Sequence, residues 1–150
     1  MKTLIELKEF LTNFNIEENK INEYLENKEL MELNDNIYLQ PKDNELLKNE
    51  ISNENLIYIK LKYDLPSILL LKWIKGNTKN ILKIKSEKRA LDFTYGKDLF
   101  TDLVTKHPKA EYTQNKFYIV EFDKEILGYV QIAEKRLNNE FHIGSYLKEN

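Results

Sequence analysis

A chain of 150 residues has room for one medium-sized domain or two small ones, each with a buried core. Hydrophobic residues make up 41% of the chain and charged residues 32%, which is ordinary for a soluble globular protein, and no apolar run approaches the ~20 residues that span a bilayer. We expect no membrane segment and no signal peptide, because glutamates interrupt the apolar N-terminus and no small-residue cleavage site follows. The chain has no cysteine, which excludes disulfides and thiolate zinc sites and favours a cytoplasmic location.

The net charge of −2 conceals three segments of unequal charge. Residues 1–59 hold 6 Lys and 13 acidic residues, residues 60–109 hold 12 Lys and Arg and 5 acidic residues, and residues 110–150 hold 5 basic and 7 acidic residues. The local net charges are therefore −7, +7 and −2. This segregation favours an anionic partner for the middle segment. A lysine-rich surface that is only solvated remains the alternative, because lysine outnumbers arginine 21 to 2 throughout the chain.

The first half of the chain is predicted to be a small module of helices and short strands. The stripe of Leu4, Leu7 and Leu11 indicates one helix, and the pair of Asn15 and Glu18 indicates the capped start of a second. The next segments predict, in chain order, a hairpin, a short helix, a strand and a helix with a proline near its start: residues 29–40, 44–51, 55–62 and 65–75. This half contains no catalytic motif.

Glycine marks the division of the chain, because all four glycines lie beyond residue 75. Gly76 directly follows the helix predicted for residues 65–75, where a helix takes its C-terminal cap. We therefore predict two domains, an N-terminal domain of residues 1–76 and a second domain of residues 77–150. Trp73, within the leucine-rich helix, is expected to pack in the core or between the domains.

The second half is richer in strand patterns than the first. A helix is predicted from about Lys97 to Lys106, where apolar residues repeat with helical spacing. Strands are predicted on both sides of it, with the strongest hairpin around the turn sequence "DKE": residues 80–85, 90–95, 116–122, 126–133 and 140–147. Short strands around one short helix, with glycine at the corners, indicate a small mixed β-barrel. The predicted fold class is therefore α+β.

Three short motifs of the second half occur in the order seen in a known family. They are the aromatic-x-Tyr-Gly of "FTYGKDLFTDLV", the Leu-Gly-aromatic strand of "ILGYVQIAEK" and the Ile-Gly-x-Tyr of "HIGSYL". Together they resemble the PUA domain, named for pseudouridine synthases and archaeosine transglycosylases. More narrowly, they resemble the Nip-seven family of large-ribosomal-subunit assembly factors. The resemblance implies a small N-terminal α/β module followed by a C-terminal PUA-like mixed β-barrel that binds RNA.

The stretch "DFTYGKDLF" is the first candidate contact with RNA. Gly96 is predicted to end a strand and open a helix, which would leave the next three backbone amides free to bind a phosphate. Tyr95 is placed to stack on a base or sugar, and Lys97 adds positive charge. The alternative is a glycine needed only for the turn, since Asp98 and Asp102 would repel an anion and stabilise the helix dipole.

Basic residues at two strand ends complete the predicted RNA face. One basic pair leads into the strand that ends at the glycine turn, and another follows the strand that begins at Gly128. Two such strand ends can lie close together in a small barrel, and the family resemblance supports the same placement. The predicted RNA-binding residues are Lys88, Arg89, Tyr95, Gly96, Lys97, Lys135 and Arg136.

Other residue groups carry little indication of chemistry. His107 and His142 are 35 residues apart and lack metal-site spacing. Glu121, Asp123 and Glu125 are expected to be solvated at a hairpin tip rather than to act as catalytic carboxylates. The sequence has no nucleotide-binding glycine loop and no serine-nucleophile motif. It therefore predicts no catalytic residue, no metal and no cofactor.

The expected function is that of a non-catalytic RNA-binding protein, specifically a large-subunit assembly factor that acts in processing of precursor ribosomal RNA. The second half would bind RNA, and the acidic first half would bind a protein partner. One alternative is a PUA-containing subunit or accessory protein of an RNA-modification enzyme. Another is an interaction module with no role in RNA binding.

Overall fold

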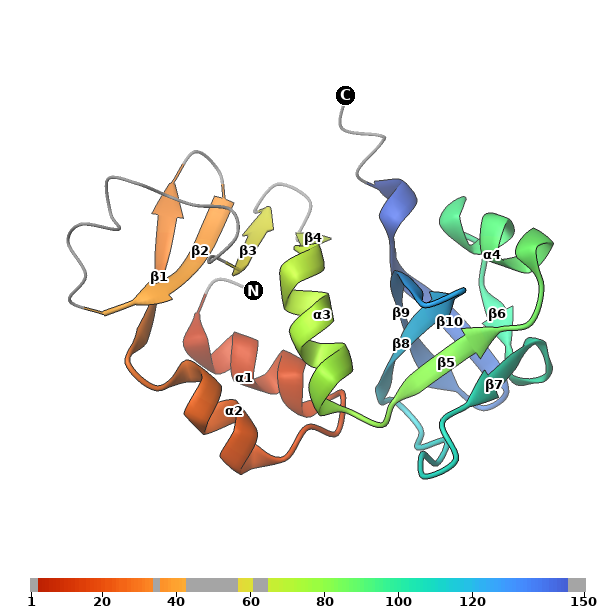
Figure 1. Cartoon of the computed structure of the whole chain (residues 1–150), viewed down its shortest axis with the longest axis horizontal. Coiled ribbons are helices and arrows are strands. Elements are labelled where there is room, and N and C mark those ends of the chain that lie inside the picture. The colour runs from red at the N-terminus through yellow and green to blue at the C-terminus, as the bar shows by residue number, and fades with distance from the viewer. Residues whose placement is uncertain (1–2, 34–35, 43–56, 61–64, 146–150) are drawn as a thin grey trace.

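The computed structural model of the chain describes residues 3–33, 36–42, 57–60 and 65–145. It is an α+β structure in which a four-stranded sheet and a six-stranded sheet lie on opposite sides of one helix, α3 (Figure 1). The elements of the first half are α1 (Leu4–Thr12), α2 (Glu18–Leu25), β1 (Lys28–Leu33), β2 (Asn36–Pro41), β3 (Ile57–Lys60), β4 (Leu65–Pro66) and α3 (Ile68–Asn77).

The two predicted N-terminal helices are confirmed, but the predicted cap of the second is wrong. Helix α1 begins after Thr3, whose hydroxyl oxygen accepts the N–H of Glu6 at 3.1 Å. Helix α2 begins at Glu18 and its N-cap residue is Glu17. Asn15 instead adopts a positive φ of 57° in the turn between the two helices, a backbone conformation that asparagine tolerates.

Helix α3 confirms the helix predicted for residues 65–75 with shifted ends. It begins after Ser67, whose hydroxyl oxygen accepts the N–H of Leu70 at 3.1 Å, and Pro66 belongs to the short strand β4. Gly76 lies inside the last turn and the C-cap is Thr78, so the predicted glycine cap is wrong. Thr78 ends the helix in an extended conformation, so no left-handed residue is needed there.

The first sheet has the order β1-β2-β3-β4, and each neighbouring pair is antiparallel. The predicted hairpin is confirmed, with a register from Lys28 opposite Pro41 to Leu33 opposite Asn36. The strand predicted for residues 55–62 is confirmed over β3. The short helix predicted for residues 44–51 lies outside the described residues.

The second sheet has the order β6-β10-β9-β8-β5-β7 and curls into a nearly closed, barrel-like form (Figure 1). Strands β5 and β8 are parallel, and the other neighbours are antiparallel. The elements of this half are β5 (Ile81–Ile84), α4 (Glu87–Thr94), β6 (Leu99–Phe100), the 3-10 helix η1 (Thr101–Leu103), β7 (Val104–Lys106), β8 (Phe117–Phe122), β9 (Glu125–Ala133) and β10 (Arg136–His142).

The hairpin of β8 and β9 is confirmed, and Asp123 and Lys124 form its turn with positive φ angles of 51° and 69°. Asp123 and Glu125 are exposed there, as expected. Glu121 is not, because its side chain is buried against α3, where it forms an ion pair with Lys75. The expectation of a solvated Glu121 is therefore wrong.

The segment between β5 and β7 reverses two predictions. The strand predicted for residues 90–95 is helix α4, and the helix predicted from Lys97 to Lys106 is replaced by β6, η1 and β7. Ala90 and Phe93 are buried three residues apart, a helical spacing that the apparent alternation hid. Leu99 and Val104 are buried as strand residues, because they pair with β10 and β5.

Among the described residues, two groups of buried apolar side chains form the core. One group fills the barrel-like sheet. The other lies under α1, α2 and α3 and includes Ile119 and Phe141 from the second half. Trp73 packs against this group and against the ring of Tyr24, with the ring centroids 3.9 Å apart, which confirms its packing role. Since the second group joins both halves, the domain boundary after residue 76 stays a prediction.

Candidate nucleic-acid interface

Helix α4 carries predicted RNA-binding residues on the outside of the barrel. Ser86 caps its start, since the hydroxyl oxygen accepts the N–H of Arg89 at 3.3 Å. Only two of its side chains are buried, Ala90 and Phe93, and they attach the helix to the barrel core. The opposite face and the C-cap are exposed and combine basic with apolar side chains: Lys88, Arg89, Leu91 and Tyr95.

The turn after α4 is a helix C-terminus and not the predicted helix N-terminus. The N–H of Gly96 donates to the carbonyl of Phe93 at 2.9 Å, and the N–H of Lys97 donates to the carbonyl of Asp92 at 3.2 Å. With Gly96 at a φ of +98°, this is a Schellman motif, which explains the glycine. The amide of Lys97 is therefore not free for a phosphate, and the helix end carries partial negative charge. The predicted phosphate site on backbone amides is wrong.

The side chains around this turn still provide cationic groups. Asp92 lies between Arg89 and Lys97, and each of the two cations is 3.9 Å from a different carboxylate oxygen. Ion pairs this long are weak where the cation is in contact with water, and the side chains of Arg89 and Lys97 are 49% and 70% exposed. Arg89 and Lys97 are therefore available to a phosphate at little cost.

Arg136 is held more firmly than the other predicted cations. Its guanidinium donates to one oxygen of Asp98 through Nε, at 2.9 Å, and through Nη2, while the N–H of Asn139 donates to the other oxygen at 2.8 Å. Burial on its own would raise the pKa of Asp98. The hydrogen bonds from Asn139 and Arg136 and the charge of Arg136 outweigh burial and hold this pKa below its usual range. Arg136 thus has a positioning role within the protein.

The same network attaches the end of α4 to strand β10. The side-chain amide of Asn139 donates to the carbonyls of Phe93 and Lys97 at 3.0 and 3.1 Å. Gly144 lies so close to the helix that an added Cβ would be 2.0 Å from the carbonyl oxygen of Thr94. The turn that displays Tyr95 is therefore fixed on two sides by the barrel.

Arg89 and Lys135 both line an open depression between α4, η1 and the turn that joins β9 to β10, and Asp102 of η1 lines it as well. Phe100 lines it and is 49% exposed, because β6 turns Leu99 inward and Phe100 outward. Tyr112 forms another part of the wall. The sequence did not indicate Phe100 or Tyr112 as site residues, since the pattern around Phe100 favours the apolar stripe of a helix.

The structure therefore brings the predicted residues together only in part. Arg89 and Lys135 share the depression, and Tyr95, Gly96 and Lys97 form the neighbouring turn. Lys88 lies on the outer face of α4, and Arg136 is paired with Asp98. The acidic residues of this surface are Glu87, Asp92, Asp98, Asp102, Glu134 and Glu140. The surface has mixed charge, so an RNA strand would depend on individual cations and exposed rings.

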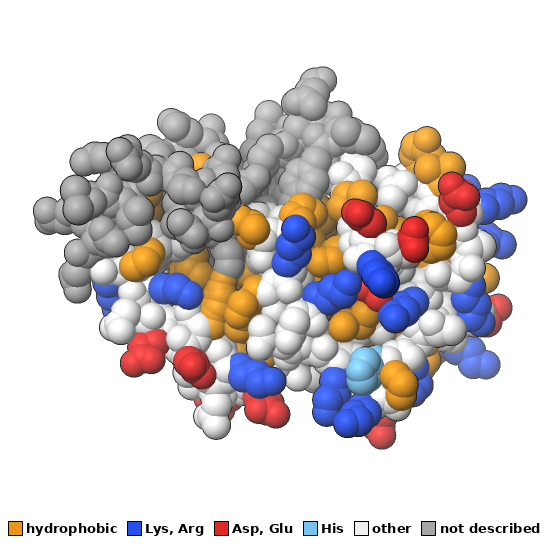
Figure 2. Space-filling model, viewed as in Figure 1, with side chains coloured by type: hydrophobic (Ala, Val, Ile, Leu, Met, Phe, Trp, Pro, Cys, Tyr) orange, Lys and Arg blue, Asp and Glu red, His pale blue; other side chains and the backbone are white. Residues whose placement is uncertain are grey.

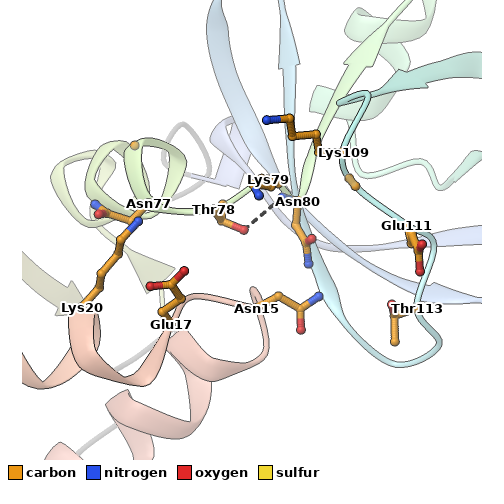
Figure 3. Close-up of a pocket in the computed structure, with 12 residues that line it drawn as sticks. Asn15, Glu17, Lys20, Asn77, Thr78, Lys79, Asn80, Lys109, Glu111 and Thr113 are labelled. Carbon is orange, nitrogen blue, oxygen red and sulfur yellow. Dashed lines mark hydrogen bonds between the residues drawn. The ribbon is translucent and has the colours of Figure 1, made fainter.

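A second, polar cavity of about 450 Å³ lies where the two halves join (Figure 3). Hydrogen bonds connect its walls. The hydroxyl of Thr78 donates to the carbonyl of Phe14 and accepts the backbone N–H of Asn80 at 3.0 Å. The side-chain amide of Asn80 donates to the carbonyl of Phe117 at 3.0 Å. Its lining side chains include three lysines and two glutamates, so their charges nearly cancel. None of the predicted RNA-binding residues lines it.

Among the described residues, no cluster of three or more His, Asp or Glu side chains is arranged to hold a metal ion. His107 accepts the N–H of Lys109 at 3.1 Å, and His142 is buried beside Gly96 and Ser145. No helix within the described residues has the length and apolar character needed to cross a membrane.

A scan against protein-family models finds no match for the chain, and a search of curated proteins finds no relative. The resemblance to the Nip-seven family therefore rests on the three short motifs alone.

Proposed function

We propose that the chain is a non-catalytic RNA-binding protein that acts in assembly of the large ribosomal subunit, with a PUA-like domain as its second half. The observation that carries the proposal is the depression beside α4, where Arg89 and Lys135 lie beside the exposed ring of Phe100. The three motifs that resemble the Nip-seven family support the ribosomal role.

The proposed interface divides its roles among three kinds of side chain. Lys88, Arg89, Lys97 and Lys135 contact phosphates, because their ammonium and guanidinium groups are exposed or only weakly paired. The rings of Tyr95 and Phe100 stack on unpaired bases, which any base allows. Arg136 fixes the position of the turn through Asp98 and is not a principal phosphate contact.

Salt-dependent RNA binding tests this proposal. Fluorescence anisotropy with a labelled single-stranded RNA should show affinity that falls steeply as salt is added, because bound cations displace counterions from the RNA. The double variant Arg89→Gln, Lys135→Gln should bind more weakly, and its salt slope should fall by about one for each phosphate that the protein no longer neutralises. The matched control is Lys8→Gln, which removes an exposed charge from α1.

Two results would overturn the interface. One is unchanged affinity in the double variant while circular dichroism shows that it is folded. The other is binding that does not respond to salt, which would exclude phosphate contacts as the main source of affinity. Crosslinking in cells followed by sequencing of the bound RNA tests the ribosomal role separately.

The first half is proposed to bind a protein partner instead of RNA. Its helices and the turns beside them expose acidic side chains: Glu6, Glu9, Glu17, Glu18, Glu23 and Glu26. Ile5 is also exposed on α1 and offers an apolar contact among these charges. This surface repels phosphate, so single Glu→Gln variants there should not weaken RNA binding and should release the partner in co-purification.

A further inference from the structure

A cavity of about 800 Å³ runs along the seam between α3 and the barrel-like sheet. We call it the seam cavity. One wall is α3, from Ile68 to Gly76. The other wall combines the start of β5, the turn between β8 and β9, and Ile143 after β10. A molecule bound here would touch both halves of the chain.

The floor of the seam cavity is aliphatic. Four partly buried isoleucines line it. Each of them also packs against one of the two core groups: Ile68, Ile81, Ile126 and Ile143. None of the described residues that line the cavity is aromatic. Because bases stack on aromatic rings, this floor suits an aliphatic side chain better than a nucleic-acid base.

The rim of the seam cavity is cationic. Lys72, Lys75 and Lys124 line it, against one carboxylate, that of Glu125. Figure 2 views the molecule from this side and shows Lys and Arg side chains gathered over α3 and β5. An acidic molecule therefore finds complementary charge around an apolar floor.

Ion pairs beneath the rim determine which lysines are free. The buried carboxylate of Glu121 pairs with Lys75, and the Lys75 ammonium also donates to the carbonyl of Lys124 at 3.3 Å. The ammonium of Lys83 lies 3.8 Å from the other oxygen of Glu121. Lys72 and Lys124 are exposed and extend from opposite walls. With the exposed Asp123 counted, four lysines face three carboxylates, a net charge of +1 around the cavity. Lys72 and Lys124 are the two of these lysines that Glu121 does not hold.

We propose that the seam cavity binds an acidic peptide segment of a partner protein, with a leucine, isoleucine or methionine side chain inserted between the four isoleucines. Carboxylates on either side of that anchor pair with Lys72 and Lys124. This site is separate from the proposed RNA interface and opposite in charge to the acidic surface of α1 and α2. A peptide bound here bridges α3 and the barrel.

Labelled peptides test the proposal on the intact chain. In fluorescence polarisation, a peptide of alternating Glu and Leu should bind, whereas a peptide of alternating Glu and Ser and one of alternating Lys and Leu should not. The double variant Lys72→Glu, Lys124→Glu should weaken binding by about tenfold or more, because both rim charges are reversed. Lys8→Glu on α1 is the matched control and should leave binding unchanged.

Methyl NMR spectra provide a measurement that does not depend on a variant. The Glu-Leu peptide should shift the methyl signals of Ile68, Ile81, Ile126 and Ile143 and leave that of Ile5, which is exposed on α1, in place. Absence of these shifts, equal binding of the Glu-Ser peptide, or full binding to the double variant would overturn the proposal. So would displacement of the peptide by RNA. The Arg89→Gln, Lys135→Gln variant should bind the peptide normally, so failure of the RNA interface is distinguishable.

Discussion

Helices α3 and α4 have similar starts and different surroundings. Each is capped by a serine hydroxyl, and they are 10 and 8 residues long. Helix α3 lies between the two halves and buries Leu70, Leu71 and Ile74 completely. Helix α4 lies on the outside of the barrel and leaves Leu91 and the C-cap residue Tyr95 56% and 70% exposed. Apolar side chains that no core needs are candidates for binding, whereas Leu70, Leu71 and Ile74 of α3 are explained by packing.

The largest expected difference between the helices is in stability. Leu71→Ala should lower the free energy of unfolding by ~2–5 kcal/mol, because it leaves a cavity in a closely packed core. Leu91→Ala should change it by less than ~0.5 kcal/mol, because the side chain is mostly in water. Urea denaturation followed by circular dichroism measures both. Equal losses would show that α4 is packed against something in solution and would contradict its role as an open surface.

Tyr95 should affect binding rather than stability. Tyr95→Ala should weaken RNA binding by ~1–3 kcal/mol if the ring stacks on a base, and should leave the salt slope unchanged, because no charge is removed. The matched control is Ile5→Ala, which removes an exposed apolar side chain from α1. A loss of thermal stability in the Tyr95 variant would instead assign this ring to the core.

The glycines near the ends of the two helices should respond in opposite directions to alanine. Gly96→Ala should destabilise the protein by ~1–2 kcal/mol, because the residue must keep a φ of +98°. Gly76→Ala should stabilise it by up to ~1 kcal/mol, since Gly76 lies in α3 and, outside its own helical turn, no atom of the described residues lies within 4 Å of an added Cβ. Thermal melting of both variants measures the difference. A destabilising Gly76→Ala would mean that the helix needs glycine there.

The contrast between these two helices explains how far the sequence could predict the structure. The hairpin of β8 and β9 was predictable because two runs rich in β-branched and aromatic residues flank the turn sequence "DKE". The α4 segment was not, because Ala90 and Phe93 satisfy a helical period and also sit within an alternating pattern. Residues 99–100 and 104–106 form strands because they pair with β10 and β5, and a local sequence pattern does not show such pairing between distant segments.

The candidate site was predictable to a similar degree. Arg89 and Lys135 were predicted to lie near each other at two strand ends. They do line one depression, although Arg89 lies on helix α4 and not at the end of a strand. The pairing of Arg136 with Asp98 depends on the side-by-side placement of β6 and β10. Phe100 becomes visible as an exposed ring only once Leu99 is known to point inward.

The smallest expected effect concerns the charge of Asp98, which holds the turn after α4 in place. Its pKa is lowered in the folded protein, where the hydrogen bonds from Asn139 and Arg136 outweigh the effect of burial. A group whose folded-state pKa lies below its unfolded-state value stabilises the protein above the unfolded-state pKa, about 3.9 for an aspartate. This stabilisation is lost as the pH falls through the folded-state pKa. Glu140 has the opposite effect on stability. Burial and the charge of Asp98 raise the pKa of Glu140, so its ionised form destabilises the folded protein at neutral pH.

The variant Asp98→Asn keeps an oxygen that can accept the N–H of Asn139 and removes the charge that Arg136 contacts. We expect it to lower the free energy of unfolding by ~0.5–1 kcal/mol at neutral pH, the scale of a partly exposed ion pair, with some recovery because Glu140 loses a repulsive neighbour. The difference from the wild type should begin to shrink below about pH 4, where Asp98 of the unfolded chain takes up a proton, and should disappear as the pH falls through the lower folded-state pKa. Urea denaturation from pH 3 to pH 7 measures it, with Asp102→Asn as the exposed control. A difference that is constant across this range would show that the carboxylate charge contributes nothing and that α4 is fixed by Asn139 alone.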